Sequence, residues 1–341
     1  MKWFITGGLG FIGTNLIKEL SKKKSFERDQ IFLYDNFSNA NFDEIKRILS
    51  KKKVVKIIKN KNDYDEKKSY LYVFKGSVEE KNNLEIYAKN FDYLIHLAAN
   101  TGVQISIQDP MNDCVKNIIG TLNFLNLYKN NKKGKFVVAS SGAPVGEGLP
   151  PFHEGSFTKP ISPYGVSKLT KEGYCHVYNK IFNVNSTAIR FSNVYGLYCK
   201  KKSSVVAKMI KDSINKKKIT INGNGKQTRD FLFVEDLVKG LINCVTKNKT
   251  KLDSLYQLGS GEELSIKTVS NTVNDLVKKK FHYKVKLEYK AKLKGDVQRN
   301  YTIPNKFKKQ FNWKINGNFD KNVEKIFNWI VNEESNFKNI L

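Results

Sequence analysis

Short apolar runs and amphipathic stretches alternate through the first half of the chain. The runs with the length and composition of strands are 2–6, 31–34, 70–74, 93–97, 135–139 and 186–190. The stretches with a helical spacing of apolar residues are about 11–24, 79–89, 110–129 and 163–182. Strands that alternate with helices are typical of a parallel sheet with helices on both faces. The pattern therefore predicts an α/β fold built on a doubly wound parallel sheet.

The rhythm becomes less regular in the second half of the chain. Helical spacing recurs over 205–215, 236–245 and 266–279. The run 255–258 has the composition of one more buried strand, which we expect to return to the first sheet. The two parts then interleave without a clean linker. We predict one domain over 1–190, joined by a later strand and helix near 230–258, and a smaller α/β domain over 191–341.

A long lysine-rich connector separates the second and third strand-like runs. Its piece 45–65 carries lysines at 51–53, 56, 59 and 61. Runs of like charge are usually solvated faces. We therefore expect a surface helix followed by a loop.

The chain of 341 residues has a formal net charge of +28, which raises the question of a polyanionic partner. Only five of its 60 basic residues are arginines, and the lysines are scattered along the chain. Proteins that read nucleic acids more often use arginine forks and interleaved aromatic residues. We therefore expect no nucleic-acid partner, although the charge can attract an anionic substrate.

Hydropathy and cysteine usage narrow the cellular setting. A hydrophobic fraction of 40% is ordinary for a soluble globular protein, and no apolar run reaches the length of about 18 residues that spans a bilayer. The cysteines show neither CxxC pairs nor a ligand spacing with the histidines. The N-terminus shows no signal-peptide pattern. We expect a reduced, cytoplasmic protein with no metal site and no membrane partner.

A glycine ladder with the sequence GGLGFIG occupies residues 7–13, between a strand-like and a helix-like run. Glycines suit this position because the backbone turns tightly and approaches a pyrophosphate, whose charge the helix N-terminus stabilises. The second strand-like run ends in Asp35, where a carboxylate can accept the hydroxyl groups of a ribose. The same carboxylate would repel a 2′-phosphate, and no arginine follows it. These features predict a Rossmann-type site for NAD rather than NADP.

A tyrosine and a lysine stand four residues apart at a predicted helix start. Ser162 can cap this helix and Pro163 suits its first position. Tyr164 and Lys168 then share one face. A phenol with an ordinary pKa of about 10 becomes a usable base when a nearby ammonium favours the phenolate, and lowering its pKa by about 3 units requires roughly 4 kcal/mol. The alternative is an exposed helical pair, which the dinucleotide motif makes the weaker interpretation.

Taken together, the motifs resemble the extended short-chain dehydrogenase/reductases, within them the NAD-dependent nucleotide-sugar epimerase branch that includes UDP-glucose 4-epimerase. The resemblance covers nearly the whole chain. Besides the glycine ladder, its marks are Asp35-Asn36, His96-Leu97-Ala98-Ala99, Asn117 with Gly120-Thr121, Ser140-Ser141, Tyr164 with Lys168, the segments 190–196 and 227–231, and Gly295-Asp296.

This resemblance implies a role for each matching residue. Tyr164 would be the acid and base, Lys168 would hold the nicotinamide ribose and polarise Tyr164, and Ser141 would hydrogen-bond the sugar. The implied cofactor-binding residues are Gly7, Gly10, Phe11, Ile12, Gly13, Asp35, Asn36, Ser77, Leu97, Ala98, Asn117, Tyr164 and Lys168. The implied substrate-binding residues are Ser141, Asn193, Arg229, Asp296 and Asn300. For Arg229 the alternative is a salt bridge with the adjacent Asp230.

The implied reaction is C4 epimerisation of a UDP-hexose or UDP-N-acetylhexosamine through a 4-keto sugar, with NAD retained on the enzyme. The domain over 1–190 would bind NAD, and the domain over 191–341 would bind the nucleotide sugar. Two alternatives stay open: a reductase or dehydrogenase of the same family with net NAD(H) turnover, and an NAD-binding sensor without catalysis. The family also implies a homodimer through the helices 110–129 and 163–182.

Related enzymes with other chemistry differ at the two positions after Ser141. The chain has Gly142 and Ala143 there, where dehydratases of the family carry an Asp-Glu pair, decarboxylases a Glu and 3,5-epimerases a Cys. Elimination of water needs a proton donor and a base. Dehydration, decarboxylation and 3,5-epimerisation are therefore not expected.

Four further positions depart from the family pattern. Ser77 stands where an Asp often binds the adenine amine, Val145 where a pocket Tyr is usual, and Leu293 where an Arg binds phosphate. Neighbouring lysines can replace that arginine as point charges. Asn300 stands where a bulky Tyr restricts the pocket to unmodified hexoses, which predicts room for an N-acetyl group.

Overall fold

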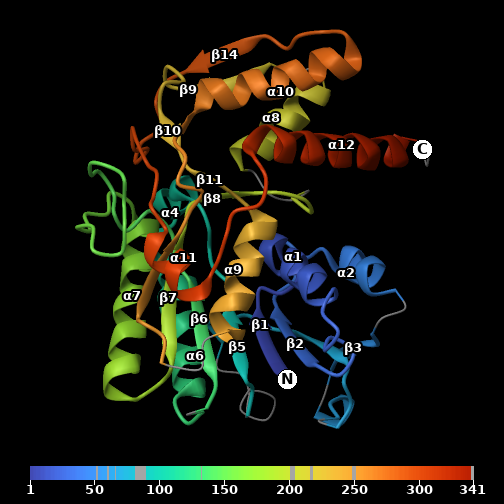
Figure 1. Ribbon diagram of the computed structural model, residues 1–341, viewed down its shortest axis with the longest axis vertical. Coiled ribbons are helices and arrows are strands. Elements are labelled where there is room, and N and C mark those ends of the chain that lie inside the picture. Colours follow the sequence, from blue (N-terminus) through green and yellow to red (C-terminus); the bar gives the residue numbers. More distant parts are fainter. Residues whose placement is uncertain are drawn as a thin grey trace.

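An eight-stranded parallel sheet forms the frame of the protein in the computed structural model (Figure 1). The structure describes residues 1–50, 53–59, 61–65, 67–80, 90–131, 133–199, 204–215, 218–247 and 251–338. In spatial order the strands are β3 (Val55–Ile58), β4 (Leu71–Lys75), β2 (Gln30–Asp35), β1 (Lys2–Thr6), β5 (Tyr93–His96), β6 (Lys135–Ala139), β7 (Ser186–Phe191) and β12 (Leu255–Leu258). The order reverses between β1 and β5, so the sheet is doubly wound and the predicted fold class is confirmed.

Helices bury both faces of this sheet. One face is covered by α1 (Phe11–Leu20), α2 (Phe42–Leu49), α9 (Val234–Thr246) and α11 (Asn305–Phe311). The other is covered by α6 (Gly120–Tyr128) and α7 (Pro163–Ile181). Successive strand residues serve opposite cores: Trp3 and Ile5 pack on the α1 side, whereas Phe4 packs on the α7 side. Because both sides are buried, the strands read as continuous apolar runs in the sequence.

The helix predicted over 110–129 is interrupted by a π-helical turn. It consists of α5 (Pro110–Cys114), the π-helical turn Val115–Ile119 and then α6. The short helix α4 (Val103–Gln108) precedes it. The extra residue of a π turn changes which side chains face inward, and such turns are frequent at functional sites.

The second half builds a smaller α/β unit with its own core. Its helices are α8 (Val205–Ile214), α10 (Ile266–Phe281) and α12 (Phe319–Lys338), which Figure 1 shows above the sheet. Its paired strands are β9 (Ile219–Asn222) with β14 (Leu287–Lys290), β8 (Asn193–Tyr195) with β11 (Phe231–Phe233), and β10 (Thr228–Arg229) with β13 (Leu264–Ser265). Strand β12 returns to the large sheet beside β7. The domain boundary at residue 190 stays a prediction.

The lysine-rich connector contains a strand that the sequence analysis missed. After α2 and before the 3₁₀ turn Lys61–Asp63, strand β3 pairs with β4 at the edge of the sheet. Ile57 is 43% exposed there, as expected for an edge strand that faces solvent on one side. Lysines interleaved with the β-branched residues concealed the strand, so the expected loop is wrong in this part of the segment.

Two segments predicted from the sequence fall mostly on residues that the structure does not describe. The predicted helix over 79–89 and the lysine-rich segment 200–202 lie almost wholly outside the described residues. Within the described part of the chain, no helix combines the length and apolar character needed to cross a membrane. The same part contains no cluster of histidine, cysteine and acidic residues suited to a metal ion. All four cysteines are free thiols.

Candidate active site

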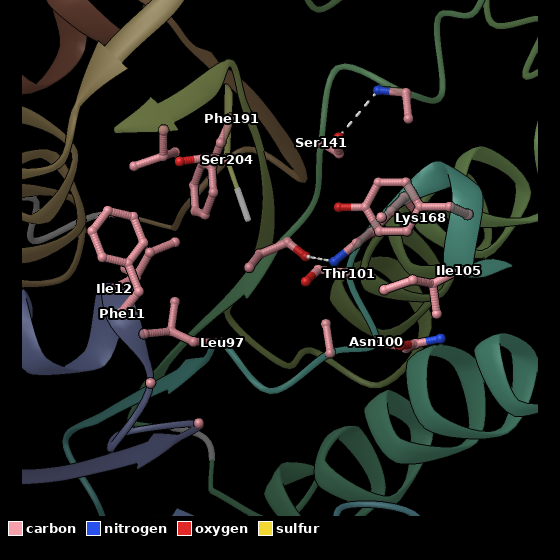
Figure 2. A pocket seen from close by; sticks show the side chains of 18 of the residues that line it. Phe11, Ile12, Leu97, Asn100, Thr101, Ile105, Ser141, Lys168, Phe191 and Ser204 are labelled. Carbon is pink, nitrogen blue, oxygen red and sulfur yellow. Dashed lines mark hydrogen bonds between the residues drawn. The ribbon is translucent and has the colours of Figure 1, made fainter. Parts of the chain in front are cut away.

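A cavity of about 890 Å³ opens at the carboxyl ends of the parallel strands. Ligands of doubly wound sheets bind at this edge, where the strand order reverses. All the site residues predicted from the sequence are described, and all of them line this cavity except Asn117. Figure 2 shows Phe11 and Leu97 on one side of it and Ser141 and Lys168 on the other. The structure thus brings the two predicted halves of the site together.

The glycine ladder forms the turn between β1 and α1 at one end of the cavity. Gly7 has a φ of +65°, and a Cβ at this residue would lie 2.8 Å from the backbone nitrogen of Ala98. A Cβ at Gly13 would overlap the carbonyl oxygens of Gly7 and Gly8. No side chain caps α1 at Gly10, and the amides of a helix N-terminus attract anions. This backbone fits the pyrophosphate of a dinucleotide, which needs the close approach that side chains would block.

Asp35 ends β2 beside this turn. Its Oδ2 accepts a hydrogen bond from the amide of Leu9 at 3.0 Å, and its Oδ1 accepts one from the amide of Phe37 at 2.8 Å. Burial raises the pKa of the Asp35 carboxyl, while these two bonds lower it. Each oxygen keeps a lone pair that can accept a ribose hydroxyl. Asn36, which also lines the cavity, accepts a bond from the amide of Ser38 and so shapes the same loop.

Ser77 lines the cavity and has a carboxylate partner that was not predicted from the sequence. Its hydroxyl donates to Oε2 of Glu79 at 2.6 Å, and both residues line the cavity. An acidic group therefore lies two residues beyond the position where the family pattern has Asp. Nothing in the local sequence pattern distinguished Glu79 from an ordinary exposed residue.

Asn117 lies in the π-helical turn, fully buried beneath the cavity. Its side chain accepts a bond from the amide of Asn100 and donates to the carbonyl oxygen of the same residue. It also donates to Asp113 at 3.0 Å and to Ser167 at 3.1 Å. Asn117 thus ties the loop after β5 to α5 and α7. The structure gives this residue a supporting position, and no cavity-facing one.

The tyrosine and lysine of α7 face the middle of the cavity. Ser162 accepts a bond from the amide of Gly165 at 3.1 Å and Pro163 is the first helical residue, so the predicted helix start is confirmed. Lys168 is only 2% exposed, which rules out the exposed-pair alternative. Its Nζ donates to the carbonyl oxygen of Ala139 at 3.0 Å (Figure 2) and lies 5.3 Å from the centre of the Tyr164 ring.

Burial shifts the proton affinities of this pair. It raises the pKa of Tyr164 to about 12, which a hydrogen bond with Ser141 partly offsets. It lowers the pKa of Lys168 to about 8, and the carboxylate of Asp113 acts in the opposite direction. Ser141 follows β6 and also accepts a bond from the amide of Ala143 at 3.2 Å. The amide of Tyr164 donates to Ser106 of α4, a positioning contact that the sequence did not reveal.

Asn193, Arg229, Asp296 and Asn300 line the other end of the cavity. Arg229 pairs with Asp296, whereas Asp230 is held by Ser260 and other groups, so the Arg229–Asp230 alternative is wrong. The arginine is only 12% exposed at its side chain. A guanidinium placed by one carboxylate retains further donors for the oxygens of a diphosphate.

The departures from the family pattern fall both inside and outside the cavity. Ala143 lines it and Val145 is buried away from it. Leu293 is 39% exposed. Lys292 and Lys294 are also exposed, and neither is among the described residues that line the cavity. Arg229 is therefore the cation that the described residues offer to a diphosphate at this end.

Fold and site together define a doubly wound dinucleotide-binding protein with a half-buried tyrosine beside a buried lysine in its ligand cavity. The chain belongs to the NAD dependent epimerase/dehydratase family, whose sequence profile it matches over residues 3–259. This match confirms the resemblance inferred from the motifs, the assignment as an enzyme and the prediction of NAD as the cofactor.

The relatives of the chain include proteins named for more than one activity. The UDP-glucuronate 4-epimerase of Thermodesulfobacterium geofontis is 32% identical over 238 residues, which are 69% of this chain and 71% of that protein. The dTDP-D-glucose 4,6-dehydratase of Dictyostelium discoideum is 30% identical over 281 residues, 77% of this chain and 59% of that protein. The crystal structure of UDP-glucuronic acid 4-epimerase from Bacillus cereus, with UDP-glucuronic acid and NAD, has a TM-score of 0.83 at 23% identity and covers 98% of this chain and 100% of that one.

Proposed function

We propose that the protein is an NAD-dependent epimerase that inverts C4 of a UDP-hexose or UDP-N-acetylhexosamine through a 4-keto sugar. The observation that carries this proposal is the half-buried Tyr164 beside the buried Lys168, in the same cavity as Ser141 and a glycine cradle. The UDP-glucuronate 4-epimerase relative supports the reaction class. Bound NAD would supply a carbon that takes up the C4 hydrogen of the sugar and returns it.

Each residue of the pair has a separate task in this reaction. Tyr164 takes the proton from the sugar O4 while the C4–H bond breaks, and gives it back when that bond forms again on the opposite face. Lys168 favours the phenolate through its positive charge. Ser141 donates to the sugar O4 and orients it toward Tyr164, because a hydroxyl can accept from Ala143 and donate at the same time.

The absence of acids beside Ser141 favours epimerisation over elimination. Gly142 and Ala143 provide no proton donor for a leaving hydroxyl and no base for C5. A dehydratase relative exists, so this difference matters for the choice. In the proposed reaction no atom leaves the sugar and the hydrogen taken from C4 is returned to it, so the reaction is redox-neutral.

The pocket wall near the sugar is made of small groups. A Cβ on Gly142 would lie 3.3 Å from Oδ1 of Asn300, so these two residues face each other across a short gap. Both line the cavity. The short side chain of Asn300 leaves volume that a tyrosine would fill, which supports acceptance of an N-acetyl substituent.

We further propose a cytoplasmic homodimer. Exposed apolar side chains lie along the helices predicted for the interface: Met111, Val115, Ile119, Val166 and Val177, with exposed fractions of 71%, 38%, 42%, 49% and 38%. Exposed apolar side chains gathered on two helices can mark an interface when they join into one patch. Leu125 and Tyr178 of the same helices belong to the core. Light scattering that returned a monomer mass at micromolar concentration would exclude the dimer.

Incubation with a panel of UDP-, GDP- and dTDP-sugars, followed by proton NMR, tests the function. An epimerase produces a second anomeric signal without added NAD(H) in excess and without a net change in NADH absorbance. Tyr164→Phe should abolish the new signal. Stoichiometric formation or use of NADH would instead identify a dehydrogenase or reductase, and no conversion of any sugar would refute the proposal.

A further inference from the structure

A second lysine is buried next to Lys168. Lys171 follows it by three residues on α7 and is 0% exposed. Among the described residues, no acceptor satisfies the Lys171 Nζ. Because the two lysines are three residues apart on α7, their side chains lie on one face of the helix. Two ammonium groups can only donate, so the pair can form a hydrogen bond only if one of the two nitrogens is uncharged and offers its lone pair.

The groups that surround Lys171 provide little compensation for a second positive charge. Asp113 of α5 is the one carboxylate that acts on it, with Oδ1 taken by Asn117 and Oδ2 left without a partner among the described residues. His96 of β5 is fully buried, and its pKa is lowered by burial and by the two lysines. Cys175 is neutral because burial raises its pKa to about 12.

The second nearby carboxylate is already engaged. Glu172 accepts two bonds from Arg190, at 2.7 and 2.9 Å, and one from Ser140 at 2.6 Å. Asp113 is therefore the carboxylate with an unoccupied oxygen beside the two lysines, whose side chains are 2% and 0% exposed. Desolvation makes a charge without a partner very costly, and a neighbouring like charge adds to that cost.

We propose that Lys171 is uncharged in the folded protein and that its nitrogen accepts a hydrogen bond from the Lys168 ammonium, which makes it a positioning residue for the Tyr164–Lys168 base. The ammonium of Lys168 then donates to Lys171 and to the carbonyl oxygen of Ala139. Lys168 also lines the cavity, so its third N–H is left for a ligand. Burial, followed by the charge of Lys168, lowers the pKa of Lys171 well below 10.5, in agreement with this assignment. The catalytic part rests on the proposed function, whereas the charge state of Lys171 does not.

The test compares three variants of the full chain. Lys171→Met removes the amine and keeps the length of the side chain. Lys171→Gln replaces the accepting nitrogen by an amide oxygen. Lys180→Met is the matched control, because Lys180 is an exposed lysine of the same helix.

Stability against pH reports the charge of Lys171 without reference to catalysis. If the folded protein holds this lysine uncharged, the unfolded chain binds one proton more below pH 10.5, and the stability of the wild type rises with pH. Lys171→Met should be more stable than the wild type, and this difference should shrink as the pH rises. Between about pH 8.5 and 10, the ratio of the two folding equilibrium constants should fall by about tenfold for each pH unit. Lys180→Met should show no such trend. A difference between Lys171→Met and wild type that is independent of pH means a charged Lys171 and overturns the proposal.

The pH profile of turnover reports the positioning role. Activity should fall on the alkaline side as Lys168 loses its proton. Without the acceptor, the charged form of Lys168 is less favoured, so Lys171→Met should move this fall to lower pH by about one unit, and Lys171→Gln should restore it. Coincident profiles for wild type and Lys171→Met would overturn the role. If the wild type converts no sugar, the proposed function fails, while the stability series still decides the charge of Lys171.

Discussion

Replacement of Asp35 by asparagine should relax the choice between NAD and NADP. The carboxylate is only 8% exposed, and both of its oxygens are fixed by backbone amides. A phosphomonoester carries a charge of about −1.5 to −2 at neutral pH. Two unit charges about 4 Å apart repel by about 1 kcal/mol in water and about 4 kcal/mol at an effective dielectric constant near 20. A 2′-phosphate beside Asp35 should therefore weaken binding by at least about tenfold relative to NAD.

The asparagine variant has two opposing effects. Loss of the charge should tighten NADP binding by about tenfold or more, because the repulsion disappears. The amide has one oxygen where the carboxylate has two, so the amide of Leu9 or Phe37 loses its acceptor at a cost of about 1–3 kcal/mol for a buried group. NAD binding should weaken for this second reason. The dissociation constant for NADP divided by that for NAD should therefore fall by more than about tenfold.

Calorimetric titration of the dinucleotide-free protein with NAD and NADP measures this ratio. Burial raises the pKa of Asp35, so on acidification this carboxylate loses its charge at a higher pH than an ordinary aspartate does. The preference of the wild type for NAD over NADP should therefore become smaller as the pH falls. A 2′-phosphate also takes up a proton near pH 6, and this step alone should remain in Asp35→Asn. Equal affinity of the wild type for both dinucleotides, or an unchanged ratio in the variant, would refute the electrostatic reasoning.

Three other substitutions probe separate parts of the molecule. Ser141→Ala should lower kcat by about 10²-fold and leave the Kd for NAD unchanged, because the hydroxyl acts on the proton transfer and not on the cofactor. An equal loss of kcat and of NAD affinity would contradict this. Glu172→Gln should destabilise the protein by about 3–5 kcal/mol in urea unfolding, because the buried guanidinium of Arg190 loses its charged partner. Gly13→Ala should weaken NAD binding by at least about tenfold with a native circular dichroism spectrum, because the new Cβ displaces the backbone of Gly8. Normal NAD binding by this last variant would show that the cradle tolerates a side chain.

Local pattern was sufficient for the sheet and for the residues whose chemistry depends on short spacing. The buried strands are continuous apolar runs, the cradle needs glycines at fixed positions, and Tyr164 and Lys168 share a face because they are four residues apart. Strand β3 was missed because it lies at the sheet edge, where lysines are compatible with one exposed side. The signal there was the cluster of β-branched residues between the lysines.

Pairs that depend on distant segments could not be found in the sequence. Arg229 pairs with Asp296, 67 positions away, and not with its neighbour Asp230. Asn117 lies in a π-helical turn and is buried outside the cavity lining, and no spacing rule anticipates that turn. Lys171 resembles any surface lysine of an amphipathic helix. Only the packing of α5, β5 and α7 around it shows that its amine is buried.

The proton affinities also indicate when the base becomes active. With a pKa of about 12, Tyr164 is protonated at neutral pH, and conversion to phenolate at pH 7 would cost about 7 kcal/mol. The Lys168 ammonium, 5.3 Å from the ring centre and bonded to Ala139, leaves most of that cost in place. The remainder has to come with the bound ligands. The same desolvation that raises the cost lowers the local dielectric constant, so each positive charge brought near the phenol counts for more. In the proposed reaction, Tyr164 would therefore stay protonated until the positively charged nicotinamide of bound NAD lies near it.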